Sequence, residues 1–230
     1  MSGHLVVAID GPAGVGKSTA ARSLALRLGV PYLDTGAMYR CLGLVAVREG
    51  LDLEDRERVE DLLGRANVEL RSRAGSAPEL LLEGVPVGDS IRTPEVSRAT
   101  SRISIYPGVR RRMVELQRAF AATHGGVLEG RDIGTVVVPS TPFKFFLDAD
   151  PRVRATRRHR ELSQRGDAAP LAVVQRELDA RDRQDRERTD SPLQRDPSHV
   201  LIDTAELTPD EVVDCMVAEI SRWGAGRNDA

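Results

Sequence analysis

The sequence predicts an α/β fold in which a parallel sheet is flanked by helices. Short apolar runs alternate with helical patterns along the chain, which is typical of βαβ units. The first apolar run, residues 5–10, leads through a glycine-rich segment directly into an alanine- and leucine-rich helical pattern. The length of 230 residues suits one domain with a small insertion, and such a domain buries a full core.

The apolar runs and helical patterns give the following elements in chain order. Thr208, Pro209 and the acids after them give the last helix an N-cap, a proline at its first position and an acidic first turn. The expected strands are residues 5–10, 31–34, 127–129, 143–148 and 199–203. The expected helices are residues 18–28, 37–49, 54–65, 109–122, 152–164, 171–186 and 209–222.

Two segments depart from this alternation. Between residues 67 and 87 the pattern changes to Val-Glu-Leu-Arg-Ser and Glu-Leu-Leu-Leu-Glu around a Gly-Ser-Ala-Pro turn, which predicts a small antiparallel insertion. The last residues, 224–230, are expected to form a frayed tail.

The glycine-rich segment after the first strand matches G-x-x-x-x-G-K-[ST]. Its glycines let backbone N–H groups surround phosphate oxygens, Lys17 reaches the β- and γ-phosphates, and the Ser18 hydroxyl is a ligand for Mg²⁺. The chain has only two lysines, Lys17 and Lys144, among 33 basic residues, so the loop keeps a slim ammonium in an arginine-rich protein. The predicted nucleotide-binding residues are Gly11, Pro12, Ala13, Gly14, Val15, Gly16, Lys17, Ser18 and Thr19.

Composition limits the other classes of protein. The net charge of −2 argues against a general polyanion binder. Cys41 and Cys215 are too few for a disulfide framework and are expected to be buried free thiols. Residues typical of a signal peptide or a membrane span are not found, so we expect a cytoplasmic protein that binds no membrane.

Four further stretches carry candidate site residues. Residues 34–40 and 129–135 each follow an apolar strand, so both are expected at the crevice beyond the carboxyl ends of the sheet. Thr35 is expected to cap the next helix, Arg40 to project from its first turn, and Glu129 to hold Mg²⁺ through water. The alternatives are an ordinary N-cap with a solvated arginine, and a surface turn with an incidental ion pair.

Residues 152–188 form two arginine-rich helices around a break at residues 166–170. Such a pair predicts a hinged lid that places guanidinium groups on a transferring phosphoryl group, although most of these arginines are expected in surface ion pairs. The fourth stretch, Ser101 with residues 106–110, is by itself more typical of helix caps than of a site.

Two other classes of protein share parts of this pattern. A GTPase also has a P-loop, but neither of the two asparagines, Asn67 and Asn228, precedes a lysine as the guanine-binding Asn-Lys-x-Asp requires. A nucleic-acid-binding protein could use the arginine run, but acids interrupt it and few aromatic residues are available for base stacking.

Four motifs together resemble the bacterial cytidylate kinase family over nearly the whole chain. They are Gly-Pro-Ala-Gly-Val-Gly-Lys-Ser-Thr at 11–19, Asp-Thr-Gly-Ala-Met-Tyr-Arg at 34–40, Gly-Arg-Asp-Ile-Gly-Thr at 130–135 and Arg-Asp-Arg-x-Asp-Arg-x-Arg at 181–188. The resemblance implies a P-loop NTPase fold with a five-stranded parallel sheet, a small inserted nucleoside-monophosphate (NMP)-binding subdomain and an arginine-rich lid. The corresponding parts are a core of residues 1–62, 103–155 and 188–223, an insertion of about 63–102, a lid of about 156–187 and a tail of 224–230.

The resemblance also implies an activity and a set of site residues. The activity is transfer of the γ-phosphoryl group of ATP to CMP and dCMP with Mg²⁺, by a monomer that binds no nucleic acid; a kinase acting on UMP and CMP together is the nearest alternative. Lys17, Arg131 and Arg188 are the expected catalytic residues, and in the lid Arg157 is the candidate, although four neighbouring residues could serve in its place. The expected substrate-binding residues are Thr35, Arg40, Ser101, Arg110, Arg131, Asp132, Arg181, Asp185 and Arg188.

Overall fold

The five predicted strands form one parallel sheet in the computed structural model, which describes residues 4–73, 76–164, 166 and 169–225. The strand order is β2-β6-β1-β7-β8, and every neighbouring pair is parallel. The predicted strand bounds are confirmed to within one residue; the apolar runs of the inner strands are buried, whereas on the edge strand, residues 200–203, only Ile202 is buried. The strands are β1 Val6–Asp10, β2 Tyr32–Asp34, β6 Gly126–Glu129, β7 Phe143–Asp148 and β8 Val200–Asp203.

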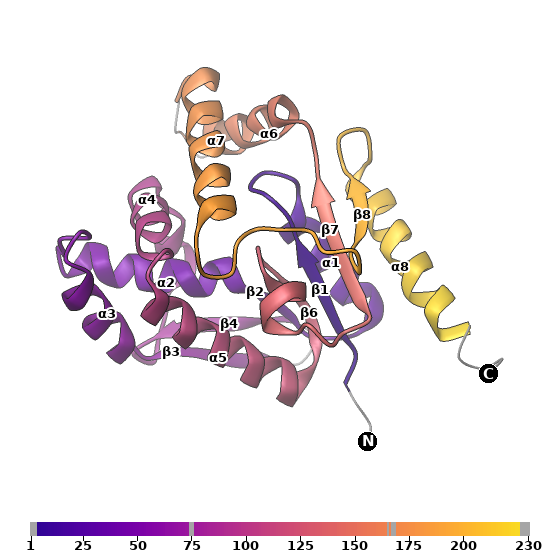
Figure 1. The fold of residues 1–230 in the computed structure, drawn as a ribbon, viewed down its shortest axis with the longest axis horizontal. Coiled ribbons are helices and arrows are strands. Elements are labelled where there is room, and N and C mark those ends of the chain that lie inside the picture. Colours follow the sequence, from indigo (N-terminus) through magenta and orange to yellow (C-terminus); the bar gives the residue numbers. More distant parts are fainter. Residues whose placement is uncertain (1–3, 74–75, 165, 167–168, 226–230) are drawn as a thin grey trace.

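Helices cover both faces of the sheet (Figure 1). Alternate residues of β1 point to opposite faces, so Ala8 packs into the core with α2 and α5, whereas Val7 and Ile9 pack into the core with α1 and α8. The helices are α1 Lys17–Leu28, α2 Thr35–Arg48, α3 Arg56–Arg65, α4 Pro94–Ile103, α5 Pro107–His124, α6 Pro151–Gln164, α7 Leu171–Glu187 and α8 Pro209–Ala225.

The predicted insertion is an antiparallel sheet of three strands. The strands are β3 Val68–Arg73, β4 Ser76–Leu82 and β5 Val85–Pro86, in the order β3-β4-β5. Residues 74–75 of its expected turn lie outside the described residues.

Helix α4 follows the insertion and was not among the predicted helices. Its start is visible in the sequence, since Thr93 accepts from the N–H of Val96 and Pro94 occupies the first turn. It packs against α2, where a methyl group at Gly43 would lie 2.2 Å from the Thr100 hydroxyl oxygen, so this glycine permits the close approach.

The two arginine-rich helices, α6 and α7, pack against each other at the top of Figure 1, between α4 on the left and α8 on the right. Their small apolar core joins Ala155, Val174 and Leu178 to Ala13 of the P-loop. Residues 165, 167 and 168 of the expected hinge lie outside the described residues.

Two expectations about the C-terminal region are corrected. Cys215 is exposed on α8, whereas Cys41 is buried as expected, because Cys215 falls on the outward side of an amphipathic helix. Gly224 and Ala225 continue α8, and residues 226–230 lie outside the described residues. In the described part of the chain, no helix is both long enough and apolar enough to cross a bilayer.

Candidate active site

The glycine-rich segment joins β1 to α1 at the carboxyl end of the sheet. Gly11 has a φ of 149°, and a methyl group there would lie 2.1 Å from the Leu147 carbonyl oxygen of β7, so only glycine fits this close crossing. The segment ends at Gly16, the N-cap of α1, and the free N–H groups of the first turn of α1 face the cleft beyond the sheet.

Lys17 is held in a position that suits an anion. Its Nζ donates to the Pro12 carbonyl oxygen at 2.6 Å, and its side chain is buried. Burial, followed by the positive charge of Arg131, lowers the pKa of Lys17 to about 7. A phosphate group beside Lys17 would offset both effects.

Glu129 lies at the end of β6, next to the P-loop helix. Its Oε1 accepts from the Tyr32 hydroxyl at 2.5 Å, and the Ser18 hydroxyl also donates to its carboxylate. Burial and the nearby charge of Asp34 raise the pKa of Glu129. Ser18 and Glu129 thus place a hydroxyl and a carboxylate side by side at the start of α1.

The segment after β2 differs from the expected capping arrangement. Asp34, not Thr35, caps α2, since Asp34 Oδ1 accepts from the N–H of Ala37 at 2.8 Å. The Thr35 hydroxyl instead donates to the Glu129 carbonyl oxygen at 2.6 Å, which ties β2 to β6. Arg40 pairs with Asp34 at 2.9 Å, so its guanidinium is held at the crevice.

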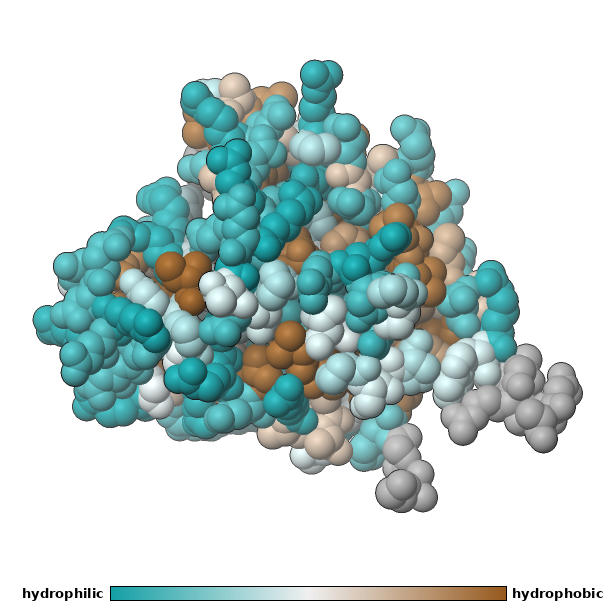
Figure 2. Space-filling view, in the orientation of Figure 1, coloured by the Kyte–Doolittle hydropathy of each residue, from teal (hydrophilic) through white to brown (hydrophobic). Residues whose placement is uncertain are grey.

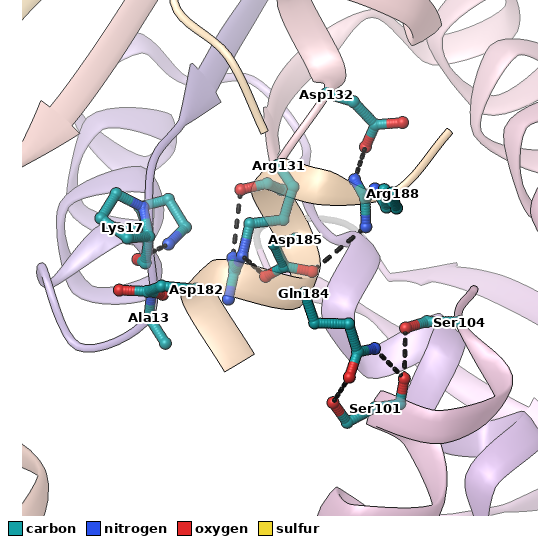
Figure 3. Close-up of polar contacts among 12 residues, drawn as sticks. Ala13, Lys17, Ser101, Ser104, Arg131, Asp132, Asp182, Gln184, Asp185 and Arg188 are labelled. Atoms are coloured by element: carbon teal, nitrogen blue, oxygen red, sulfur yellow. Dashed lines mark hydrogen bonds and ion pairs between the residues drawn. The ribbon is translucent and has the colours of Figure 1, made fainter. Parts of the chain in front are cut away.

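Five of the predicted substrate-binding residues form one chain of ion pairs, most of which Figure 3 shows. Arg131 Nε donates to Asp185 Oδ2 at 2.9 Å, and Arg188 Nη1 donates to the other oxygen of Asp185 at 3.2 Å. Asp132 lies between Arg110 at 2.5 Å and Arg188 at 3.8 Å. Asp132 therefore pairs with these two arginines rather than with its neighbour Arg131.

Burial of this network is nearly complete, and its effect on the two carboxylates differs. Burial raises the pKa of Asp132 in spite of Arg110 and Arg188. Burial also opposes ionisation of Asp185, but the three arginines 131, 181 and 188 outweigh it and lower the pKa of Asp185.

Several of these arginines keep unused donors. In the part of the chain that the structure describes, Nε of Arg40, Nε of Arg110 and Nη2 of Arg188 are buried without a hydrogen-bond acceptor. A buried N–H group without an acceptor is costly, so such groups indicate a place for a ligand's oxygens.

Ser101 of α4 meets the lid helix. Its hydroxyl donates to Gln184 Oε1 at 3.3 Å, and Gln184 Nε2 donates to the Ser101 carbonyl oxygen at 2.5 Å (Figure 3). The motif spacing alone did not indicate Gln184, because it occupies the variable position between Arg183 and Asp185.

A cavity of about 340 Å³, the central cleft, opens beside the P-loop. It is lined by residues of the P-loop, β2–α2, α4, β6 and the two lid helices, so segments far apart in the sequence meet there. Burial and the charge of Arg131 lower the pKa of Arg181, which also lines the cleft, to about 10. The predicted site residues that line the central cleft are Ala13, Gly14, Gly16, Lys17, Ser18, Thr19, Arg40, Arg131 and Arg181.

Arg157, the candidate lid arginine, lies elsewhere. Its Nη2 donates to the Thr204 carbonyl oxygen at 2.6 Å, so it is attached to the loop after β8. It lines a second cavity of about 270 Å³, the α8 cavity, together with Gly16, Thr19, Leu207 and other residues. The P-loop therefore separates Arg157 from the central cleft.

One buried network near the P-loop was missed. Arg154 of α6 donates to the Ala13 carbonyl oxygen at 3.1 Å and pairs with Asp182 of α7, and Asp182 accepts from the N–H of Ala13 at 3.3 Å. Among so many arginines and acids of the lid helices, the sequence does not distinguish this buried pair from the surface pairs.

The fold and the site together define the class of protein. A P-loop beside a charged cleft, beyond the carboxyl ends of parallel strands, is the arrangement of a P-loop phosphotransferase. The cytidylate kinase family model matches residues 7–222, and the chain belongs to this family. The cytidylate kinase of Pelotomaculum thermopropionicum is 44% identical over 97% of both chains. That of Solibacter usitatus is 45% identical over 98% of this chain and 96% of its own.

A solved structure shows the same fold at lower similarity. A protein of uncharacterised function from Eubacterium ventriosum superposes with a TM-score of 0.51 at 12% identity, covering 95% of this chain and 99% of that chain. At this identity the likeness concerns the fold alone.

Proposed function

We propose that the protein transfers the γ-phosphoryl group of ATP to CMP and dCMP, giving ADP with CDP or dCDP. The observation that carries this is the electrostatics of the central cleft. Lys17, Arg131 and Arg181 are crowded together, and burial with mutual repulsion lowers the pKa of Lys17 and of Arg181. Polyphosphate is the ligand whose charge matches such a cleft.

We propose that each of the two cavities that flank the P-loop accepts one nucleotide. The α8 cavity, with apolar Leu207, Pro209 and Val212 beside Arg157, suits the nucleoside of ATP. The central cleft, with Arg40 and Arg131, suits the phosphate of the acceptor. The two substrates then approach from opposite sides of the P-loop, which is the arrangement that in-line transfer requires.

Positioning and electrostatics account for the chemistry. The attacking atom is an oxygen of the CMP phosphate, which is ionised at neutral pH, so the reaction needs no general base. Lys17 would neutralise charge on the β- and γ-phosphates, whereas Arg131 and Arg188 would hold the acceptor phosphate in line. Arg157, on the α8 cavity, would then contact the donor nucleotide rather than the transferring group.

Mg²⁺ fits the residues beside the P-loop. Mg²⁺ in kinases is bound by one or two protein oxygens together with substrate phosphates and waters. The Ser18 hydroxyl and the Glu129 carboxylate supply such a pair, Ser18 directly and Glu129 through water. The described residues contain no cluster of three or more histidine, cysteine or acidic ligands, so the phosphates would complete the coordination. When bound, the ion would neutralise charge on the transferring group.

The base is proposed to lie against Ser101, Arg110 and Asp132. Cytosine presents an amino donor where uracil presents a carbonyl oxygen, so a carboxylate can accept from cytosine and is left unpaired with uracil. The free Nε of Arg110 can donate to the acceptor edge of the pyrimidine. Sites of this kind discriminate by roughly 10⁴-fold.

Both proposed nucleotide sites are built from residues of one chain, so we propose that the enzyme works as a monomer. We also propose that it works in the cytoplasm. Hydrophilic side chains cover most of the face in Figure 2, and we propose no nucleic-acid partner. Light scattering coupled to gel filtration measures the mass of the protein in solution and so tests the monomer. A binding assay with labelled RNA at near-physiological salt tests whether the protein binds nucleic acid.

The direct test is an ADP-release assay with ATP and each of CMP, dCMP, UMP, AMP, GMP and shikimate as acceptor. We expect turnover with CMP and dCMP and little with the others. Equal rates with UMP and CMP would support a UMP/CMP kinase instead, and turnover only with another acceptor would refute the proposal.

The Asp132→Asn variant tests the base contact. The amide has a donor where the carboxylate has an acceptor, so we expect the ratio of kcat/KM for CMP over UMP to fall, mainly through the CMP value. If Asp132 only neutralises Arg110 and Arg188, the variant lowers both values equally and the ratio stays unchanged.

A further inference from the structure

A cluster of charged side chains lies behind residues 130–134, on the side away from the central cleft. Its members come from three separate places: the end of β1, strand β7 and the segment before β8. Asp10, His199 and Lys144 are buried, and Asp196 lies at the edge of the cluster. Lys144 is the second of the chain's two lysines, and the proposed reaction makes no use of it.

Asp10 binds the backbone of the loop directly. Its Oδ1 accepts from the N–H of Ile133 and its Oδ2 from the N–H of Gly134, both at 2.7 Å. These N–H groups open the single π-helical turn Ile133–Val137 and have no partner within that turn. Arg131 and Asp132 immediately precede Ile133 and Gly134 in the chain. The carboxylate of Asp10 therefore fixes the position of the backbone from which the side chains of Arg131 and Asp132 project.

His199 supports Asp10 from behind. His199 Nε2 lies 3.4 Å from Asp10 Oδ2, and Nδ1 lies 3.1 Å from Asp196 Oδ1. A methyl group at Gly134 would lie 2.6 Å from Nε2, so the imidazole is also packed against the loop. The ring of Phe146 closes the other side, edge to face at 6.2 Å.

The charges of the cluster are complementary. Burial alone would lower the pKa of His199, but its contacts with Asp10 and Asp196 outweigh burial and the pKa is raised. Lys144 Nζ lies 3.9 Å from Asp196 Oδ2, on the far side of the same carboxylate. Two carboxylates and two basic groups thus alternate along the cluster, which favours one arrangement of the loop.

We propose that His199 is a positioning residue of the acceptor site, which acts by holding Asp10 against the loop that carries Arg131 and Asp132. The inference rests on the proposed contact of these two residues with CMP. Its consequence is selective: loss of His199 disturbs the binding and choice of the acceptor, whereas the donor site, built on α1 and the α8 cavity, is retained. A merely structural role would lower stability without this selectivity.

The test compares His199→Leu with His199→Gln. Leucine fills the space but cannot donate to Asp10, whereas the glutamine amide restores a donor. For His199→Leu we expect KM for CMP to rise at least tenfold, KM for ATP to stay within twofold, and the CMP:UMP ratio of kcat/KM to fall. For His199→Gln we expect KM for CMP and the CMP:UMP ratio to return most of the way to the values of the unmodified protein. The matched control is His124→Leu, an exposed histidine at the end of α5.

Gly134→Ala disturbs the same contact from the side of the loop. This variant replaces His199→Leu in the test if His199→Leu does not fold. The added methyl group separates the loop from the imidazole, so KM for CMP should rise again. If both act through one contact, the double variant should be little worse than either single one, because coupled sites are not additive. Additive effects on KM for CMP would argue for two independent disturbances and against the proposal.

The remaining outcomes separate this proposal from the proposed function. If Arg131→Ala and Asp132→Asn raise KM for CMP but His199→Leu lowers only the thermal midpoint, His199 is structural and the positioning role is wrong. Equal increases in KM for CMP and ATP would also overturn it. If Arg131→Ala and Asp132→Asn leave KM for CMP unchanged, the acceptor site itself has been placed wrongly.

Discussion

At the scale of single residues, the central cleft and the ion-pair network that extends from Arg131 hold more positive charge than their carboxylates neutralise. Asp185 forms ion pairs with both Arg131 and Arg188, and Asp132 forms ion pairs with both Arg110 and Arg188. Among the described residues, the hydrogen-bond partner of the Lys17 ammonium is a carbonyl oxygen, that of Pro12. Arginine keeps its charge under these conditions, whereas lysine responds by releasing a proton.

Nucleotide binding should therefore be accompanied by proton uptake at Lys17. With a pKa of about 7, Lys17 is largely deprotonated in the free protein at pH 8, and the phosphates of a bound nucleotide raise this pKa again. We expect uptake of close to one proton per nucleotide at pH 8 and much less at pH 6. Calorimetric titration with a non-hydrolysable ATP analogue in two buffers of different ionisation enthalpy measures it.

The control for proton uptake is Lys17→Arg, whose guanidinium stays protonated at pH 8. We expect the same fold, loss of the buffer-dependent heat and a turnover lower by orders of magnitude. Identical binding heats in both buffers for the unmodified protein would contradict the lowered pKa.

Gln184 occupies the place that we propose for the base. Its amide presents an acceptor and a donor to Ser101, the same pair of groups that the N3/N4 edge of cytosine presents. CMP must displace these two hydrogen bonds, so Gln184→Ala should lower KM for CMP, by roughly five- to thirtyfold if each hydrogen bond contributes about 0.5–1 kcal/mol. Steady-state kinetics with Gln175→Ala, on the same helix, as control measures the change. A higher KM would show instead that Gln184 contacts the substrate.

At the scale of elements, the lid helices are attached to the P-loop and not only to each other. Arg154 of α6 and Asp182 of α7 both bind the backbone of Ala13, and their ion pair is buried. Helices α6 and α7 and the P-loop thus share one buried polar network.

Removing one partner of this pair should be costly. Asp182→Ala leaves the Arg154 guanidinium buried without its carboxylate, a change that costs about 3 kcal/mol or more. For a chain of this size the thermal midpoint should fall by roughly 6–12 °C. Thermal unfolding followed by circular dichroism measures it, with the exposed Asp179→Ala on the same helix as control. A fall no larger than that of the control would mean that the pair does not hold the lid.

At the scale of the whole molecule, the sheet positions a site that belongs to no single element. Two apolar cores fill the space on the two faces of the sheet, and a third lies under the lid. The central cleft collects side chains from the P-loop, from helix α4 and from helices α6 and α7. A ligand there touches parts that otherwise meet through few contacts, so binding should stabilise the molecule as a unit.

CMP should raise the thermal midpoint more than UMP does. A ligand at about 100 times its dissociation constant adds about 2.7 kcal/mol to the free energy of unfolding. For CMP this corresponds to a midpoint higher by roughly 5–11 °C. UMP at the same concentration should give a much smaller shift, because uracil offers Asp132 a carbonyl oxygen in place of the amino donor of cytosine. Scanning fluorimetry with each nucleotide measures both, and equal shifts would argue against discrimination at the binding step.

The sequence by itself determined the order of strands and helices, the P-loop and the family, because these depend on local patterns. Apolar runs, caps and glycine spacing act within a few residues, and the five strands accordingly lie where the sequence predicts them. Helix α4 was missed although Thr93 and Pro94 mark its start and its buried residues, Val96, Ala99, Thr100 and Ile103, recur at helical spacing. The domain limits and the roles of the site residues stay predictions.

Only the tertiary structure decided which charges meet. The sequence places Asp132 beside Arg131, yet it pairs with Arg110 and Arg188, and Asp10 meets His199 from the other end of the chain. Ion pairs are selected by burial and distance, and dozens of arginines and acids offer equivalent partners along the chain. The fold selects among them, because burying a charge is tolerable only where the sheet brings an opposite charge or a backbone donor alongside it.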